Sequence, residues 1–260
     1  MAIKIIAENI WKTFQSTNGP IDAIKDFNLK VDEGKFVSIV GPSGCGKSTF
    51  LRILAGLVSA TSGNLQIIPG KDTSKPLNSV VFQEYAIFPW RTVLDNVVFG
   101  LEMRGISKKE RLEVARHWID SVGLNKFIHC YPHQLSGGMK QRVSIARALA
   151  NDPEVLLMDE PLGALDAQTR NVLQEELLKL WEATHKTVIY ITHSIEEAVL
   201  LSDEVVLMTA HPGTNKINFE ISIPRPRDLK ITGTPEFARL SYAIWDVLRD
   251  EVIAAMEDQR

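Results

Sequence analysis

Residues 36–54 read FVSIVGPSGCGKSTFLRIL, an apolar run followed by a glycine-rich loop and then by a helical pattern. The apolar run is typical of a strand buried on both faces of a sheet. In the loop, residues 41–49, glycines allow backbone N–H groups to converge on phosphate oxygens where a helix begins. We therefore expect this loop to bind nucleotide phosphates, through Gly41, Pro42, Ser43, Gly44, Cys45, Gly46, Lys47, Ser48 and Thr49.

Two side chains of this loop have chemistry suited to a nucleotide with its metal ion. Lys47 supplies positive charge to the β- and γ-phosphates, and the Ser48 hydroxyl is the expected Mg²⁺ ligand. The alternative is a glycine-rich turn between strand and helix with an incidental lysine. The flanking strand and helix favour the phosphate loop, because they are the context that the pattern requires.

Further apolar runs rich in Val and Ile alternate with helical patterns along the chain. This alternation predicts an α/β fold with a mostly parallel sheet wrapped by helices. Near the amino end, the segments IKIIAEN and IDAIKDFNLKVDEG alternate apolar and polar residues, which predicts an additional antiparallel β layer and a mixed central sheet. The predicted strands of the central sheet lie at residues 36–40, 79–82, 155–158, 187–191 and 204–208.

The strand signal disappears between residues 92 and 150, where three helical patterns follow one another. We expect residues 92–150 to form a helical subdomain inserted into a nucleotide-binding core made of residues 1–91 and 151–223. Residues 224–260 then form a proline-containing turn and a last helix. Thr234 can cap that helix with Pro235 at its first position, and its apolar face is Phe237, Leu240, Ile244, Leu248 and Val252.

Bulk properties exclude several classes of protein. The formal charge of −3 and pI near 6.1 lack the basic footprint of nucleic-acid binding, so we expect no nucleic-acid partner. No apolar run approaches the roughly 20 residues that span a bilayer. The two cysteines, Cys45 and Cys130, cannot form a disulfide framework, which fits a reducing cytosol.

The run VLLMDE ends a predicted strand with Asp159 and Glu160, at the sheet edge where open α/β sheets bind ligands. Adjacent strand residues point to opposite sides. Asp159 can therefore bind the metal, while Glu160 faces the water that attacks the terminal phosphate. A solvated strand end is the alternative, and the phosphate loop upstream makes it less attractive.

At residues 135–142 the chain reads LSGGMKQR. Ser136 and the N–H groups of Gly137 and Gly138 begin a helix and can form a second phosphate site, although a capped helix start alone would also explain them. With this motif, the chain resembles the ATP-binding-cassette (ABC) ATPases among P-loop proteins. The resemblance implies a P-loop NTPase fold of ABC-ATPase type, Mg²⁺-dependent ATP hydrolysis, and a head-to-tail dimer of two copies that encloses ATP.

The resemblance also assigns individual residues. Gln83 matches the glutamine that contacts Mg²⁺ or the attacking water, and His193 matches the switch histidine that contacts the γ-phosphate. Asp166 matches the residue that communicates across the dimer, but it reads equally well as a helix cap. Phe14 matches the aromatic residue that stacks on adenine, with Trp11 as the second candidate. Leu162 departs from the family pattern, which often has Phe there, and we interpret this as a packing change.

Over residues 3–255 the resemblance is to importer ATPases for nitrate, sulfonate, taurine and bicarbonate. It implies a peripheral subunit on the cytoplasmic face of a bacterial inner membrane, partnered by integral-membrane permease subunits and indirectly by a solute-binding protein. The segment YAIFPWRTVLDNV resembles the groove that receives the permease, although Trp90 could instead pack beneath the helical subdomain. A soluble non-transport ABC ATPase and a non-hydrolysing regulator remain as alternative functions.

Overall fold

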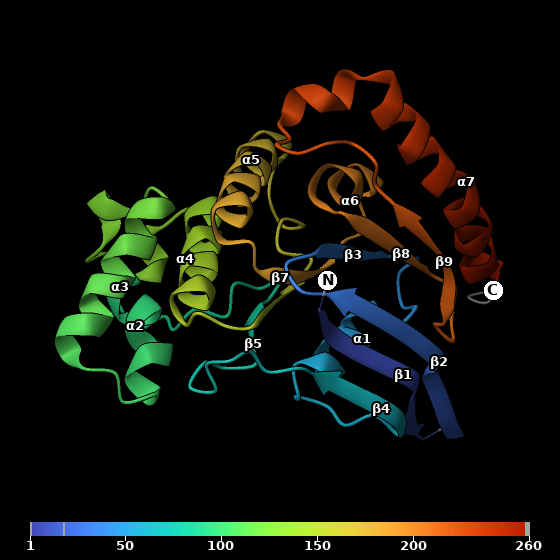
Figure 1. Ribbon diagram of the computed structural model, residues 1–260, viewed down its shortest axis with the longest axis horizontal. Coiled ribbons are helices and arrows are strands. Elements are labelled where there is room, and N and C mark those ends of the chain that lie inside the picture. The colour runs from blue at the N-terminus through green and yellow to red at the C-terminus, as the bar shows by residue number, and fades with distance from the viewer. Residues whose placement is uncertain (1, 18, 258–260) are drawn as a thin grey trace. The chain divides into compact units, whose positions relative to one another are not determined.

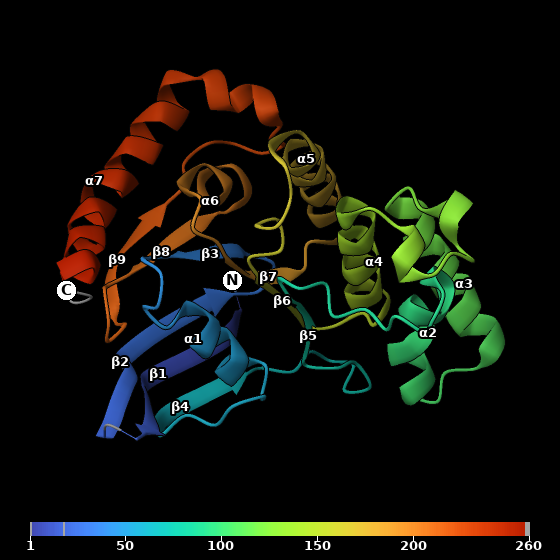
Figure 2. The same cartoon turned by 180° about the vertical axis from the view of Figure 1, so that it is seen from behind.

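The computed structural model describes residues 2–17 and 19–257. These residues form two compact units, each with its own core. The first unit comprises the described residues up to Pro69 and those from His185 onward, and the second is Gly70–Thr184. The ribbon in Figures 1 and 2 shows the elements of each unit from two opposite sides.

The first unit contains the expected antiparallel β layer. Its strands are β1 (Ile3–Ser16), β2 (Gly19–Asp32) and β4 (Ser62–Ile67), in the order β2-β1-β4. Apolar side chains alternate with polar ones, because only one face of this sheet is buried. A β-bulge shifts the register between Ala7 and Ile10 of β1. The prediction of an antiparallel layer from the amino-terminal segments is thus confirmed.

A parallel sheet forms the other β layer of the first unit. Its central strand β3 (Phe36–Val40) pairs in parallel with β7 (Thr187–Ile191) and with β8 (Glu204–Met208). The strand β9 (Asn215–Glu220) adds to β8 in antiparallel orientation. Every residue of β3 and β7 is buried, which explains why these runs are mostly apolar.

Helices complete the first unit. Helix α1 (Lys47–Leu54) follows β3 and lies beside the antiparallel sheet in Figure 2, where the rings of Phe27 and Phe50 have centroids 4.5 Å apart. Helix α6 (Ile195–Leu201) packs against β3 and against α7 (Pro235–Glu257), which begins just after the 3₁₀ helix η3 (Leu229–Gly233).

Helix α7 begins as its sequence predicts but buries one different residue. The Thr234 hydroxyl accepts a hydrogen bond from the backbone N–H of Phe237 at 3.3 Å. The last buried position belongs to Glu251, and Val252 is only half-buried. Glu251 is accommodated because its carboxylate accepts the backbone N–H of Ala210 at 2.7 Å and lies 2.9 Å from the Lys216 ammonium.

The second unit combines a strand pair with helices. Its strands β5 (Asn78–Val81) and β6 (Val155–Asp159) are parallel. The residues predicted to be helical form α2 (Val93–Met103), α3 (Lys108–Ser121) and α4 (Gly137–Ala150), with the 3₁₀ helices η1 (Asn125–Phe127) and η2 (Pro132–Gln134) between the last two.

Helices α2, α3 and α4 share one apolar core, and α5 (Ala167–Thr184) follows β6. Hydroxyls of Thr92, Ser107 and Ser136 cap α2, α3 and α4. Among the described residues, none of the helices combines the length and the apolar character needed to cross a membrane.

Candidate functional site

In the first unit, the phosphate loop wraps around Lys47. Lys47 is only 6% exposed, and its ammonium donates hydrogen bonds to the backbone oxygens of Gly41 and Pro42, each at 2.8 Å. The Cys45 sulfur lies 3.7 Å from the same nitrogen. The lysine therefore holds the loop closed and brings a positive charge to its centre.

The start of α1 is suited to an anion. Gly46 occupies the N-cap position with φ 105°, so no side chain caps the helix, and its first turn contains no acidic residue. The first backbone N–H groups of a helix have no partner within the helix, and the helix dipole makes this end positive. A Cβ at Gly46 would lie 2.6 Å from the backbone oxygen of Ala23, so this position requires glycine. The loop thus fits the phosphate groups of ATP.

Gly213, which the sequence did not indicate as a site residue, packs against the phosphate loop. A Cβ built on Gly213 would lie 1.9 Å from the backbone oxygen of Cys45, so the two backbones are in direct contact. Hydrogen bonds from Lys25 N–H to Gly213 O and from Gly213 N–H to Ala23 O fix this contact. No local pattern distinguishes Gly213 from an ordinary turn glycine, because its role depends on a segment far away in the sequence.

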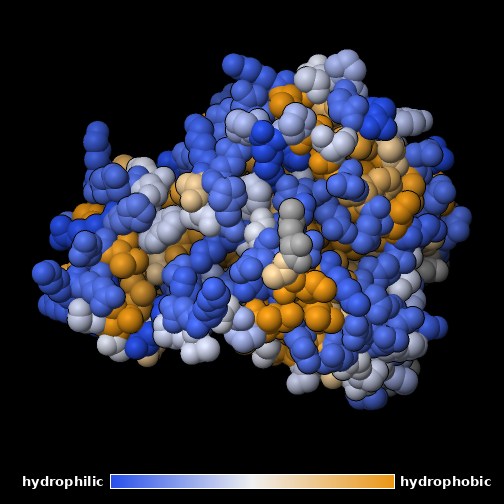
Figure 3. Space-filling view, viewed as in Figure 1, coloured by the Kyte–Doolittle hydropathy of each residue, from blue (hydrophilic) through white to orange (hydrophobic). Residues whose placement is uncertain are grey.

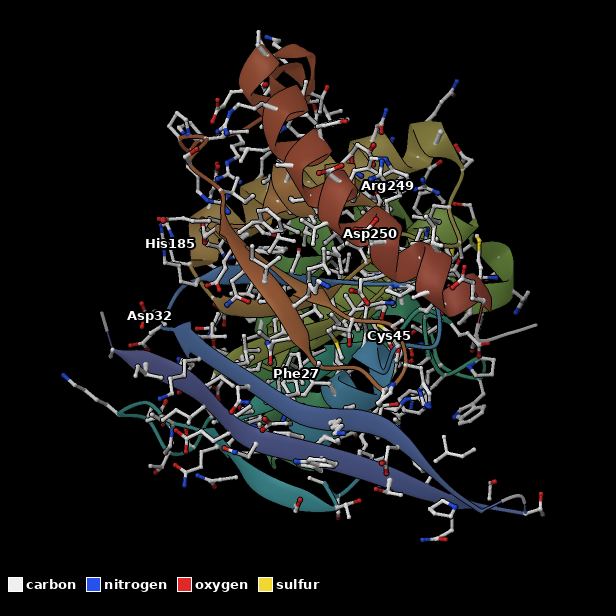
Figure 4. All side chains as sticks on the ribbon, turned by 90° about the vertical axis from the view of Figure 1, so that its right-hand side faces the viewer. Phe27, Asp32, Cys45, His185, Arg249 and Asp250 are labelled. Atoms are coloured by element: carbon white, nitrogen blue, oxygen red, sulfur yellow. The ribbon has the colours of Figure 1, made fainter. Side chains whose placement is uncertain are left out.

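Cys45 itself is buried within the loop, and Figure 4 shows it with Phe27 near α1. Burial raises the pKa of the Cys45 thiol, although the Lys47 charge acts in the opposite direction. A thiol in such surroundings is a weak nucleophile at neutral pH.

Two other expected site residues of the first unit lie on the surface. His193 is exposed directly after β7, where Thr192 is held by a hydrogen bond from its hydroxyl to the buried carboxylate of Glu197 at 2.9 Å. The same carboxylate oxygen accepts the hydroxyl of Tyr190 at 3.0 Å. Glu197 therefore fixes the turn that carries His193, a role that the sequence reading missed.

Phe14 is 42% exposed in β1, and the Lys12 ammonium lies 4.7 Å from the centre of its ring. Trp11 is less exposed and contacts the Lys25 ammonium at 5.5 Å. An exposed aromatic face with a cation beside it can stack on a nucleotide base. Phe14 is the more exposed of the two rings, and its contact with adenine stays a prediction.

In the second unit, the acidic pair lies at the end of β6. Asp159 is the last residue of the strand and only 7% exposed. Glu160 lies beyond the strand with φ 43°, a left-handed conformation that is unfavourable for a residue with a Cβ. Strand alternation therefore does not apply to Glu160, because the strand ends at Asp159, and the orientation of Glu160 stays a prediction.

The side chains of Glu160 and Gln83 both approach Gly163. A Cβ built on Gly163 would be 3.6 Å from Oε2 of Glu160 and 3.7 Å from Nε2 of Gln83. Leu162 is fully buried with Leu165 and Leu173, which agrees with its interpretation as a packing change. Gly163 was not recognised from the sequence, although a glycine three residues after the acidic pair was available as a signal.

The signature segment begins α4 as expected. The Ser136 hydroxyl accepts the backbone N–H of Met139 at 3.3 Å, so its role as a helix cap is real. A Cβ at Gly138 would lie 2.7 Å from Cγ2 of Thr169, which requires a small residue there. Asp166 also caps a helix, and the N–H of Thr169 that it accepts at 3.0 Å lowers the pKa of its carboxyl.

The chemistry of the expected metal ligands fits Mg²⁺. Ser48, Gln83 and Asp159 offer a hydroxyl, an amide oxygen and a carboxylate. All three are hard oxygen donors, the kind that Mg²⁺ prefers.

An aromatic cluster covers the start of α2. The Phe88 ring lies 4.6 Å from the Phe99 ring and 5.7 Å from the Trp90 ring, and Arg91 and Arg147 lie over its faces. Trp90 is 72% exposed. It therefore does not pack beneath the helical subdomain, and the interpretation of this segment as an interface stays a prediction.

Known proteins resemble the chain over almost its whole length. It is 51% identical over 259 residues to an uncharacterized ABC transporter ATP-binding protein of Methanocaldococcus jannaschii, covering 99% of this chain and 96% of that one. It is 44% identical over 245 residues to a nitrate import ATP-binding protein of Synechocystis, covering 92% of each. It is 42% identical over 265 residues to a taurine import ATP-binding protein of Roseobacter denitrificans, covering 96% and 97%.

A solved structure, a dimeric post-hydrolysis state of an ATP-binding cassette bound to ADP and Pi, matches with a TM-score of 0.74 and 34% identity, covering 85% of this chain and 100% of that one. The family model described as ABC transporter matches residues 24–163, more than half of the chain. The fold is confirmed as that of an α/β P-loop ATPase. The chain belongs to the ABC transporter family, as one of its ATP-binding ATPase subunits.

Proposed function

We propose that the chain is the ATP-hydrolysing motor of an importer for a small anion, of the nitrate, sulfonate, taurine or bicarbonate type. The observation that carries the catalytic part is the position of Glu160, which has a left-handed backbone and a carboxylate near Gly163, where the Gln83 amide also lies. Strained backbone of this kind costs about 1–3 kcal/mol and collects at active sites. The cargo class is supported by the import proteins to which the chain is similar.

Each site residue has a proposed role. Glu160 orients or deprotonates the attacking water, and Gln83 assists in holding that water. Lys47 stabilises charge on the transferred phosphoryl group, and His193 contacts the γ-phosphate. Mg²⁺, bound by Ser48, Gln83 and Asp159, would neutralise phosphate charge when present. The adenine stacks on Phe14, and the phosphates bind where α1 begins.

The proposed working unit contains two copies of the chain. Ser136, Gly137 and Gly138 of one copy contact the ATP bound by the phosphate loop of the other, and Asp166 communicates between the copies. Closure around ATP moves the permease, and hydrolysis reopens the pair. The exposed Trp90, with the half-buried Phe88 beside it, is the surface proposed to receive the permease, which would place the chain at the cytoplasmic face of the cell membrane.

The experiment that tests this proposal combines the chain with its permease. Candidate permease subunits from the same genome are co-expressed, purified with the chain and reconstituted in liposomes. ATPase activity is then measured with solute-binding proteins loaded with nitrate, a sulfonate, taurine or bicarbonate. Stimulation by one loaded anion-binding protein is the expected result.

A different outcome would favour the alternative. A chain that hydrolyses ATP but neither co-purifies with a permease nor responds to any loaded binding protein would be a soluble ABC ATPase. The comparison is informative because basal hydrolysis needs only the nucleotide site, whereas stimulation also needs the permease surface.

A further inference from the structure

Helix α7 has two apolar faces, and only one of them is buried in the first unit. The buried positions are Phe237, Leu240, Ile244, Leu248 and Glu251. Four large apolar residues of the same helix are exposed by 67%, 45%, 48% and 62% of their surface: Tyr242, Trp245, Ile253 and Met256. At 3.6 residues per turn, these four gather roughly 140° around the helix from the buried face.

The exposed face, which we call the α7 stripe, consists of Tyr242, Trp245, Arg249, Ile253 and Met256. Its members are separated by steps of about three, four, four and three residues, the steps that keep side chains on one helix face. The order of these steps is the same when it is counted from either end of the stripe. Arg249 is the central residue. Figure 3 shows orange residues at the upper right of the view, the region where Figure 1 draws α6, β9 and α7.

This symmetry suits a second copy of the same helix. In a contact with two-fold symmetry, residue i of one copy meets residue j of the other and the reverse. Two antiparallel α7 helices centred on Arg249 would place Tyr242 opposite Met256 and Trp245 opposite Ile253. Each aromatic ring then meets an aliphatic side chain, and Arg249 meets its own counterpart.

The charges at the centre are compatible with this pairing. Arg249 lies 3.6 Å from Oδ1 of Asp246 and 3.7 Å from Oδ1 of Asp250, and Figure 4 shows Arg249 and Asp250 as neighbours on α7. Two copies would bring together two arginines and four carboxylates. The guanidinium of each copy can bind the carboxylates of the other copy. These contacts offset the repulsion between the two arginines.

The α7 stripe begins beside the nucleotide-binding face of the first unit. A hollow of about 390 Å³ is lined by His193 and Glu196 on one side and by Ser241, Tyr242 and Trp245 on the other. The Ser241 hydroxyl is buried there without a hydrogen-bond partner. The face that carries the proposed switch histidine therefore continues directly into the α7 stripe.

We propose that α7 pairs with α7 of a second copy in an antiparallel, two-fold contact that forms without nucleotide. The inference rests on the proposed function in one respect: the proposed function also brings a second copy to the face that bears His193. A single helix pair buries less than the roughly 1,600 Å² of a standard stable interface. The contact is therefore weak by itself, and it keeps two cassettes near each other when ATP is absent.

Cysteine crosslinking tests this geometry in the purified chain. Residue 249 lies on the symmetry axis, so Arg249→Cys should form a disulfide-linked dimer with or without ATP, in a buffer of high salt that screens the aspartates left without their arginine. Ala254→Cys is the matched control, because Ala254 is exposed on the side of α7 that faces away from the stripe. We expect crosslinking at position 249 to be at least about tenfold faster, because the contact raises the effective concentration of the two thiols. The wild-type chain, with buried Cys45 and half-buried Cys130, gives the background.

The direction of the helices is tested with two further variants. In an antiparallel pair, position 242 of one copy lies about 21 Å along the axis from position 242 of the other. Tyr242→Cys and Met256→Cys should therefore each fail to crosslink alone and should crosslink when mixed. Self-linking of Tyr242→Cys as fast as the mixture, or equal rates for Arg249→Cys and Ala254→Cys, would overturn the proposal.

A separate measurement distinguishes this inference from the proposed function. Trp245→Glu should disrupt only the α7 contact. The double variant with Glu160→Gln and Trp245→Glu should therefore still form dimers that ATP traps. Crosslinking at position 249 without ATP-trapped dimers would instead leave the α7 contact standing and remove the catalytic proposal. Loss of binding to vesicles of anionic phospholipid by Trp245→Glu, with no crosslink in solution, would show that α7 meets a lipid surface and would overturn the proposal.

Discussion

Nε2 of Gln83 and Oε2 of Glu160 both lie within 4 Å of the position that a Cβ of Gly163 would occupy. An amide follows β5 and a carboxylate follows β6, the neighbouring parallel strand, so the sheet brings together residues that are far apart in the sequence. A hydrogen-bonding group beside a carboxylate is the arrangement that holds and activates a water molecule.

Replacing Glu160 by Gln should abolish turnover while ATP binding remains. The amide keeps the shape of the side chain but cannot accept a proton, and loss of a general base typically lowers the rate about 10²–10⁴-fold. Phosphate release and nucleotide affinity are the two measurements. Glu113→Gln, an exposed carboxylate on α3, should behave as wild type. Turnover of Glu160→Gln at the wild-type rate would exclude Glu160 as the base.

Lys47→Ala should abolish nucleotide binding, measured by calorimetry or with a fluorescent ATP analogue. The substitution removes the charge at the centre of the loop and leaves the backbone oxygens of Gly41 and Pro42 without their donor. A buried acceptor without a partner costs about 1–3 kcal/mol, so the thermal midpoint should fall as well. Lys109→Ala, on the exposed part of α3, serves as the control and should change neither quantity.

Alkylation of Cys45 should block ATPase activity, and ATP should protect against it. A group added to the sulfur would collide with the loop, since even a Cβ at Gly41 would come within 2.9 Å of it. Burial raises the pKa of this thiol, so the rate of alkylation should keep rising with pH beyond the ordinary thiol value of about 8.5. The Cys45→Ala chain, in which only Cys130 can react, should be insensitive. Full activity after confirmed modification of Cys45 would contradict this prediction.

Glu197→Ala should lower the free energy of unfolding by about 1–3 kcal/mol, because the hydroxyls of Tyr190 and Thr192 lose a buried acceptor. Glu197→Gln keeps an acceptor oxygen and should cost less. Urea unfolding measures both. Since Thr192 precedes His193, the alanine variant should also lower kcat more than it weakens ATP binding. Equal stability of Glu197→Ala and wild type would show that these hydrogen bonds do not hold the turn.

Trp90→Ala should leave basal ATPase activity and thermal stability unchanged, because the side chain is 72% exposed. It should reduce co-purification with the permease, since buried aromatic anchors typically contribute at least about 2 kcal/mol to an interface. Tyr131→Ala, an exposed aromatic residue elsewhere in the second unit, is the comparison. Undiminished co-purification of Trp90→Ala would remove Trp90 from the proposed permease surface.

The sequence by itself determined the kind of fold and the principal motifs. Strand β3, the loop closed by Lys47 and the start of α1 follow from local periodicity, glycine content and capping, which act over a few residues. The capping roles of Thr234 and Ser136 were also predictable, because the hydroxyl reaches a backbone N–H only three residues away.

Only the tertiary structure decided which residues support these motifs. The contact of Gly213 with Cys45, the place of Gly163 beside Glu160, and the burial of Glu251 instead of Val252 depend on segments that are distant in the sequence. The left-handed backbone of Glu160 also could not be predicted from strand alternation. Such a conformation is tolerated only where the surrounding packing imposes it. Local pattern fixes which elements form, whereas burial and backbone strain are properties of the packed chain.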